Sequence, residues 1–201
     1  MDASWPHRYT WNTRANFGMK AQRLARQDWL EIGLQLLSTD GEKALTLERL
    51  CQAAERTKGS FYHHFKSHDD FVVALLTYWQ FEYTDQIIAT VEQLEDVNER
   101  RRKLDYLAAS IDSRLEREIR NWSGVDERVQ QILQRVDEER IQYLVTLICE
   151  LGQPDPDVAY ELAIIEYATF VGLQQLFPQS ESHWIERLFN RVTQLISSLN
   201  R

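Results

Sequence analysis

Residues 46–68 read TLERLCQAAERTKGSFYHHFKSH and decide the fold of the first part of the chain. Two short helical patterns follow one another, separated by a tight turn. In the first, apolar residues recur at helical spacing behind Thr46, whose hydroxyl suits an N-cap. In the second, Thr57 is the N-cap candidate, and Phe61 and Phe65 lie one turn apart on one face. The other side is small, polar and cationic, so it can approach a duplex closely. The stretch therefore predicts a helix-turn-helix that enters the major groove of DNA.

The polar side of the second helix supplies the candidate DNA contacts. Lys58 and Lys66 flank the string Gly-Ser-Phe-Tyr-His-His-Phe at 59–65. Most charged surface residues are merely solvated, but cations on both sides of such a string favour contacts with phosphates or base edges. The candidate DNA-binding residues are Thr46, Lys58, Gly59, Ser60, Tyr62, His63, His64 and Lys66.

At these residues the chain resembles the tetracycline-repressor-like (TetR) family of bacterial transcription regulators. The string at 59–65 follows Thr46 at the distance found in that family, which is more specific than helical periodicity alone. In the family pattern, a tyrosine hydroxyl and a histidine imidazole bind phosphate, and the resemblance implies these roles for Tyr62 and His64. The resemblance weakens after about residue 80.

Three positions depart from the family pattern. Glu55 replaces a turn glycine, so we expect a turn that avoids positive φ, because a left-handed glutamate is sterically costly. Arg56 replaces an apolar residue. His68 stands where a basic residue is common, and a neutral imidazole is expected to give a weaker phosphate contact than an ammonium group.

The distribution of charge orients the chain relative to DNA. The whole chain has 23 Lys+Arg and 31 Asp+Glu, a net charge of −8. Residues 1–66 hold 10 basic and 7 acidic residues, a net of +3, and residues 67–201 hold 13 and 24, a net of −11. Phosphate attracts the first part and repels the second. We therefore predict a DNA-binding domain at 1–66, with its motif at about 46–65, and a second domain at 67–201.

The predicted fold class is all-α, with a three-helix DNA-binding head and eight or nine helices in total. Only 7 Gly and 4 Pro occur, and long stretches contain neither, which favours helices over a turn-rich β fold. Outside the motif, helical patterns run from Leu30 to Gly41, from Ser67 to about Leu94, from Asn98 to Ser123, over 125–151 as one helix or two, over 157–177, and from a cap at Ser180 or Ser182 to the end.

Composition also bears on location. No apolar run approaches the ~18 residues that a membrane-spanning helix needs, and the first residues lack the pattern of a signal peptide. Cys51 and Cys149 are far apart and follow no ligand spacing, which favours reduced thiols. We expect a cytoplasmic protein with no membrane association.

The resemblance implies that the second domain binds a small-molecule effector among its middle helices. Aromatic residues of those helices are the pocket candidates, although each one alone is also typical of core packing. These candidates are Trp79, Tyr83, Tyr106, Trp122, Tyr143 and Tyr167.

The resemblance also implies a homodimer formed by the last two helices. The helix over 157–177 carries apolar residues on more than one side, so it needs cover on both sides. A central helix of a monomeric bundle is the alternative. The candidate interface residues are Ala163, Phe170, Gly172, Trp184, Leu188 and Leu195.

Metal chemistry is the other interpretation of the histidines. His64 and His68 are four residues apart, which can chelate a metal on a continuous helix, but Lys66-Ser67 predicts a helix break between them. His68-Asp69 is also the dipeptide of helical metal-dependent phosphohydrolases, which need further ligands at long spacing, and only His183 lies downstream. No nucleophile elbow or phosphate-binding glycine loop is present. We expect no catalytic residue, metal or cofactor.

These observations predict a DNA-binding transcriptional regulator. It would be a ligand-responsive repressor that binds a palindromic operator in double-stranded DNA as a homodimer. An all-α metal-dependent phosphohydrolase-like enzyme is the alternative.

Overall fold

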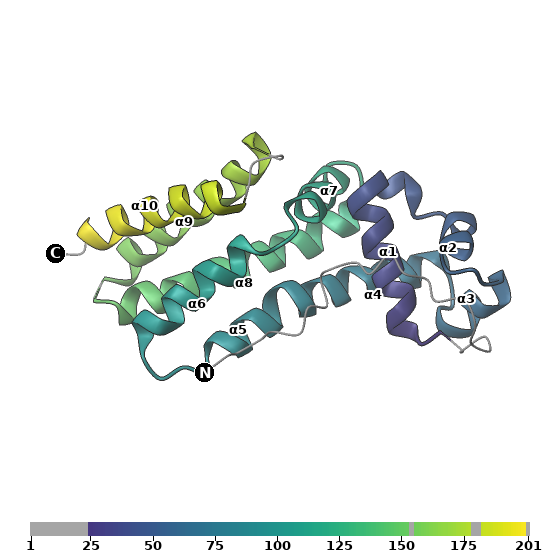
Figure 1. Ribbon diagram of the computed structural model, residues 1–201, viewed down its shortest axis with the longest axis horizontal. Helices are drawn as coiled ribbons and strands as arrows, with labels where there is room; N and C mark the ends of the chain where they lie inside the picture. The colour runs from purple at the N-terminus through teal and green to yellow at the C-terminus, as the bar shows by residue number, and fades with distance from the viewer. Residues whose placement is uncertain (1–23, 153–154, 178–181, 200–201) are drawn as a thin grey trace.

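Figure 1 presents a computed structural model of the chain, which describes residues 24–152, 155–177 and 182–199, with backbone alone for 182–186 and 196–199. In this part of the chain every regular element is helical and no strand occurs, which confirms the all-α prediction. The molecule is elongated: α2 and α3 lie at one end, and α9 and α10 lie toward the other (Figure 1). None of the described helices is long and apolar enough to cross a membrane.

The head consists of three helices and a short 3₁₀ turn. These are α1 (Arg26–Asp40), η1 (Glu42–Ala44), α2 (Leu47–Ala53) and α3 (Lys58–His64). The body begins with α4 (His68–Gln80), which continues through a π-helical turn, η2 (Phe81–Asp85), into α5 (Gln86–Val91). It is completed by α6 (Val97–Ala109), α7 (Ser113–Ser123), α8 (Glu127–Glu150), α9 (Pro156–Leu176) and α10 (Ser182–Leu199). With α4, η2 and α5 counted as one rod, the described residues form nine helices, within the predicted range.

Three predicted N-caps are confirmed. The Thr46 hydroxyl accepts a hydrogen bond from the backbone N–H of Arg49 at 3.3 Å. The Thr57 hydroxyl caps α3 by accepting from the backbone N–H of Ser60 at 3.4 Å. The Ser67 hydroxyl caps α4 by accepting from the backbone N–H of Asp70 at 3.0 Å. Such a cap satisfies an N–H group without a helical partner and typically contributes about 1 kcal/mol. Side-chain caps therefore set where each helix of the motif begins.

The single helix predicted for 98–123 is wrong: this segment forms α6 and α7. The Asp112 carboxylate accepts from Arg114 N at 3.0 Å and starts a new helix, although the apolar spacing continues across the break. A short polar residue can satisfy first-turn N–H groups anywhere along a periodic pattern, so periodicity alone does not reveal the break. The start of α6 is also earlier than predicted, because Asp96 rather than Asn98 is the N-cap.

The undecided stretch 125–151 forms one helix, α8. Asp126 caps it by accepting from Arg128 N at 3.0 Å. Ser123 takes no part in this cap, because it is the last residue of α7 and its hydroxyl donates to the Arg120 carbonyl at 2.7 Å.

Two hydrophobic cores hold the helices together. The first joins α1, α2 and α3 to α4, α7 and the first half of α8. In it, a Cβ on Gly33 would lie 2.7 Å from the Phe71 ring and 2.9 Å from Leu75, so α1 and α4 cross where only glycine fits. The second core joins the end of α8 to α9 and Phe189 of α10. Because the first core crosses residue 66, the division into two domains at that residue stays a prediction.

Candidate nucleic-acid interface and ligand cavity

An aromatic cluster fixes the position of α3. The Phe61 ring is fully buried and lies 5.4 Å from the Trp29 ring in an edge-to-face arrangement. It also lies 5.0 Å from Phe65 and 5.4 Å from Phe71, centroid to centroid. Such aromatic pairs add to the burial of apolar area and prefer specific ring angles. The side of α3 opposite Phe61 is therefore presented in a defined orientation.

The residues expected to contact DNA lie on α3, just after it at Lys66, and at the start of α2 at Thr46. Thr46, Lys58, Gly59, Tyr62, His63 and Lys66 are exposed, and Ser60 and His64 are half-buried. Tyr62 is 52% exposed, so its hydroxyl is accessible from outside. A Cβ on Gly59 would meet only the Thr57 hydroxyl oxygen at 3.7 Å, an ordinary contact. The packing of the protein itself therefore does not require glycine at this position.

The expectation for Glu55 is wrong, because its φ is +51°. Glu55 follows the end of α2, where its own N–H donates to the Gln52 carbonyl at 3.1 Å and the next N–H, of Arg56, donates to Cys51 at 3.0 Å. These bonds pair carbonyls that the end of a helix leaves free, as left-handed C-caps do. The closure of α2 therefore offsets the steric cost of the left-handed residue.

His68 does not take the place of a cationic phosphate contact. Its imidazole Nε2 is hydrogen-bonded to the carbonyl oxygen of Leu45, in the segment between η1 and α2. This bond ties the first residue of α4 to the head. Among the described residues, no group of three or more His, Cys, Asp or Glu side chains could hold a metal ion.

The body contains a cavity bounded by η2, α5, α6, α8, α9 and α10. The volume of this cavity is about 70 Å³. Its lining is mostly apolar and aromatic, with two carboxylates and one guanidinium among the described residues. The lining residues are Tyr83, Thr84, Ile87, Ile88, Leu104, Asp105, Ala108, Ile111, Arg140, Tyr143, Leu144, Glu166, Tyr167, Phe170 and Phe189.

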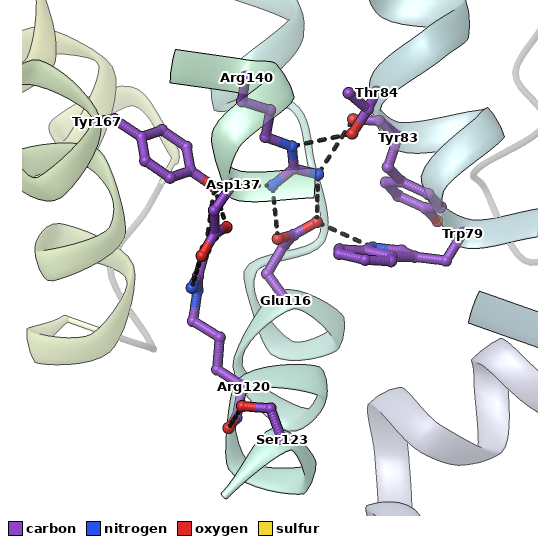
Figure 2. Close-up of polar contacts among 9 residues, drawn as sticks. All are labelled: Trp79, Tyr83, Thr84, Glu116, Arg120, Ser123, Asp137, Arg140 and Tyr167. Carbon is purple, nitrogen blue, oxygen red and sulfur yellow. Dashed lines mark hydrogen bonds and ion pairs between the residues drawn. The ribbon is translucent and has the colours of Figure 1, made fainter. Parts of the chain in front are cut away.

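Arg140 of α8 is the centre of a buried polar network beside this cavity (Figure 2). Its guanidinium forms a bidentate pair with Glu116 of α7, at 3.0 Å and 3.1 Å. The remaining donors go to the Thr84 hydroxyl at 2.9 Å, the Tyr83 carbonyl at 3.3 Å and the Tyr167 hydroxyl at 3.3 Å. A guanidinium has five N–H donors, and all five are used.

A second pair lies next to the first in Figure 2. Arg120 of α7 binds Asp137 of α8 through two bonds, at 2.9 Å and 2.7 Å, and Tyr167 donates to Asp137 at 2.7 Å. Burial raises the pKa of Tyr167 to about 12, with Arg140 opposing the shift. The hydroxyl of Tyr167 therefore keeps its proton over the physiological range and can donate the hydrogen bond to Asp137.

A third cluster contains two carboxylates and one arginine. Arg101 of α6 binds Asp105 at 3.0 Å and Glu166 of α9 at 2.5 Å, and it donates to the Thr193 hydroxyl at 2.8 Å. Glu166 is completely buried. Burial raises the pKa of both carboxyl groups, and the positive charge of Arg101 opposes the rise. The sequence pattern alone did not predict this cluster.

The head of the molecule resembles known proteins in sequence. The sequence profile described as bacterial regulatory proteins, tetR family, matches residues 30–75, which contain most of α1, all of α2 and α3, and the start of α4. Residues 30–75 thus match the tetR family in sequence. The transcriptional regulator AcuR of Cereibacter sphaeroides is 38% identical over 53 residues, which cover 26% of this chain and 24% of AcuR. The chain thus aligns with about a quarter of that tetR-family relative.

Solved structures extend the likeness to the whole fold. A transcriptional regulator from Saccharomonospora viridis, in complex with choline, has a TM-score of 0.72 at 16% identity, covering 86% of this chain and 97% of that one. A TetR transcriptional regulator from Legionella pneumophila has a TM-score of 0.73 at 15% identity, covering 88% and 99%. At these identities the likeness establishes the fold.

The candidate effector residues fall into three groups. Tyr83, Tyr143 and Tyr167 line the cavity. Trp79 and Trp122 lie in the first core, and the Trp79 indole N–H donates to Glu116 at 3.0 Å. Tyr106 is 60% exposed, on the outside of α6.

The candidates for the dimer interface divide too. Ala163 and Phe170 are buried inside the chain's own second core, because α9 turns that side toward α8 and α10, so they cannot reach a partner. Gly172 and Leu188 are half-buried, and Leu195 is 65% exposed. The side chain of Trp184 lies outside the described residues.

Proposed function

We propose that this protein is a DNA-binding transcriptional regulator, and that a homodimer of it binds a palindromic operator. The observation that carries DNA binding is the exposed polar side of α3, fixed from behind by the Phe61 cluster. Lys58 and Lys66 neutralise phosphates, and Tyr62 is well placed to bind one. The net charge of +3 over residues 1–66 favours the same orientation.

A second copy of the chain is the proposed partner of α9 and α10. On α9, Ile165, Ala168, Gly172 and Leu176 recur every three or four residues. Ile165 is 55% and Leu176 is 73% exposed, and Leu195 adds an exposed leucine on α10. This apolar stripe supports a two-fold interface, since a contiguous exposed apolar face needs cover. The dimer would hold two copies of α3 about 34–36 Å apart, the spacing of successive major grooves.

The cavity is the proposed effector site. The similar S. viridis structure holds choline, which supports a small-molecule role for the same fold here. The rod α4–η2–α5 begins one turn after α3 and contributes Tyr83 and Thr84 to the cavity. A ligand that prefers one position of this rod would change operator affinity by its difference in binding energy, typically about 1–3 kcal/mol. We propose that the ligand releases a repressor from DNA in the cytoplasm.

Fluorescence anisotropy with a random-sequence duplex at low salt tests the DNA interface. Tyr62→Ala and Lys66→Ala should weaken binding to all sequences. Lys66→Ala should also flatten the salt dependence by about 0.9 in the logarithmic slope, because one phosphate is no longer neutralised. Arg102→Ala, an exposed cation of α6, is the matched control and should bind as the parent does. Equal binding by all four proteins would remove α3 from the interface.

We do not propose the enzyme alternative. His68, whose pairing with Asp69 suggested it, is hydrogen-bonded to the Leu45 carbonyl.

A further inference from the structure

We propose that the cavity binds a small ammonium ion, with Glu166 as its counter-ion and the surrounding aromatic rings as its walls. The inference rests on the proposed ligand response of the same cavity and names the chemical class of the ligand. Four observations carry it: the sum of the buried charges, an unpaired carboxylate oxygen, the absence of a spare donor on Arg140, and the aromatic lining.

The charged groups of the three clusters do not balance. Each arginine is paired, but one carboxylate is in excess: when all four carboxyl groups are ionised, three positive and four negative groups give a net charge of −1. The groups are Arg101, Arg120 and Arg140, and Asp105, Glu116, Asp137 and Glu166. An uncompensated charge in a buried site is costly unless a counter-ion or a proton neutralises it. A ligand with one positive charge would complete the balance.

The excess lies at Glu166, at the wall of the cavity. One of its oxygens accepts from Arg101, and the other, Oε2, is buried and has no hydrogen-bond partner among the described residues. Buried carboxylate oxygens without a partner are rare, because such a group loses its hydration and gains nothing in return. Glu166 lines the cavity, so the positive charge of an ammonium group inside it would offset the charge of this carboxylate.

The guanidinium of Arg140 in the lining cannot serve an anionic ligand. All five of its donors are occupied, by Glu116, Thr84, Tyr83 and Tyr167. An anion would have to break one of these bonds and would also meet the carboxylates of Asp105 and Glu166. The lining therefore discriminates against negative charge.

The remaining walls suit a cation. Five aromatic rings of the described residues face the cavity: Tyr83, Tyr143, Tyr167, Phe170 and Phe189. The face of an aromatic ring attracts an ammonium group, and the attraction grows when water is excluded. The cavity of about 70 Å³ is smaller than the ~300–1,000 Å³ of sites for drug-sized ligands, so the ion must be small.

Calorimetric titration of the full chain with three ligands of one shape tests the charge requirement. Choline carries one positive charge, 3,3-dimethylbutan-1-ol is its neutral carbon counterpart, and 3,3-dimethylbutanoate is a similar anion. Choline should bind at least about tenfold more tightly than the alcohol, and the anion should bind most weakly. Methylammonium is added as a smaller cation. Equal affinity for choline and the alcohol, tighter binding of the anion, or no binding of either cation at millimolar concentration would overturn the proposal.

Substitution of Glu166 tests whether this residue is the counter-ion of the bound cation. Glu166→Gln should lower choline affinity about tenfold and leave the alcohol unchanged, because the amide keeps the shape and removes the charge. Glu161→Gln, on the exposed side of the same helix, is the matched control. Unchanged choline affinity in Glu166→Gln would remove this residue as counter-ion. The three-ligand comparison uses the unaltered chain, so it decides the charge requirement even if Glu166→Gln does not fold.

Operator binding separates this inference from the proposed function. Binding of choline that depends on Glu166 but leaves DNA affinity unchanged would support the ammonium site and contradict the ligand response. Normal DNA binding by a chain that takes up neither cation would overturn the ammonium site and leave the DNA-binding function standing.

Discussion

At the scale of single residues, the side chains of α3 either pack against the protein or face outward, where DNA would bind. Phe61 faces the protein and is fully buried, whereas its neighbour Tyr62 is half exposed. Gly59 and Lys58 lie on the outer side as well, where nothing in the protein's own packing restrains them. Substitutions on this side should therefore change DNA binding without changing the fold.

Gly59→Ala is the sharpest test of this separation. The added methyl meets only an ordinary contact in the protein, and alanine favours a helix by roughly 0.5–1 kcal/mol over glycine, so the variant should melt at the same temperature or higher. The same methyl would stand between α3 and a closely approaching duplex, so DNA affinity should fall, on the order of tenfold for ~1.4 kcal/mol. Unchanged DNA affinity would mean that the duplex does not approach α3 at this residue.

Glu55 gives a second prediction at this scale. Its φ of +51° costs a residue with a side chain about 1 kcal/mol or more, a cost that glycine avoids. Glu55→Gly should therefore raise the free energy of unfolding by up to about 1 kcal/mol in urea denaturation, with DNA binding retained. Ala53→Gly, in the last turn of α2, is the control and should destabilise the protein. A loss of stability in Glu55→Gly would show that interactions of the Glu55 side chain outweigh the backbone cost.

At the scale of elements, Arg140 connects α8 to α7, α9 and the π-helical turn η2. Its bond to the Tyr83 carbonyl and its bond to the Thr84 hydroxyl both end on η2, the point where the rod α4–α5 departs from regular α-helical geometry. π-helical turns frequently lie at functional sites. The network thus fixes the part of the rod that borders the cavity.

Removing Arg140 should destabilise the protein, because the charge of Glu116 would then be buried without its arginine. Arg140→Met leaves Glu116 buried and unpaired on this side, so we expect a decrease of about 3–5 kcal/mol in the free energy of unfolding. The double variant Arg140→Met/Glu116→Gln should recover much of this stability, and Arg140→Lys should not, because lysine lacks the forked donors. Urea denaturation measures all three. If Arg140→Met were as stable as the parent, the network would not stabilise the fold as described.

Glu166 and Asp105 predict how stability depends on pH. Their pKa is raised by burial, so above the ordinary carboxyl range the folded chain binds more protons than the unfolded chain. This contribution to stability is complete below the ordinary carboxyl pKa and is lost as the pH rises through the raised values. The melting temperature measured without ligand from about pH 5 to about pH 8 should fall more in the parent than in Glu166→Gln. Identical profiles would contradict the raised pKa of Glu166.

At the scale of the whole molecule, the sequence predicted the head better than the body. The caps at Thr46, Thr57 and Ser67 act within one helical turn, so a short stretch of sequence reveals them. The polar clusters were missed because their members come from helices distant in sequence. A signal was nevertheless present: Arg140 and Glu166 each interrupt an apolar stripe, four residues from an apolar neighbour on either side.

Two of the candidate interface residues, Ala163 and Phe170, lie in the chain's own core for a related reason. An apolar pattern says that a residue is covered but not by which partner, so Ala163 and Phe170 were assigned to another copy although α8 and α10 cover them. Gly172 remains a useful position, because a Cβ there meets nothing within 4 Å. A small side chain at Gly172 therefore leaves the chain's own packing unchanged and would act on the proposed partner.

Selection of bound sequences from random duplex DNA tests the central claim most directly, that two copies of α3 contact one operator. The parent chain should enrich a palindrome whose half-sites lie about 10–10.5 base pairs apart, or a multiple of this distance. Gly172→Arg, which adds a charge to the proposed interface, should sediment at the monomer mass of 23.8 kDa and enrich no palindrome. A parent chain that itself sediments at 23.8 kDa, or that enriches no symmetric sequence, would contradict the account.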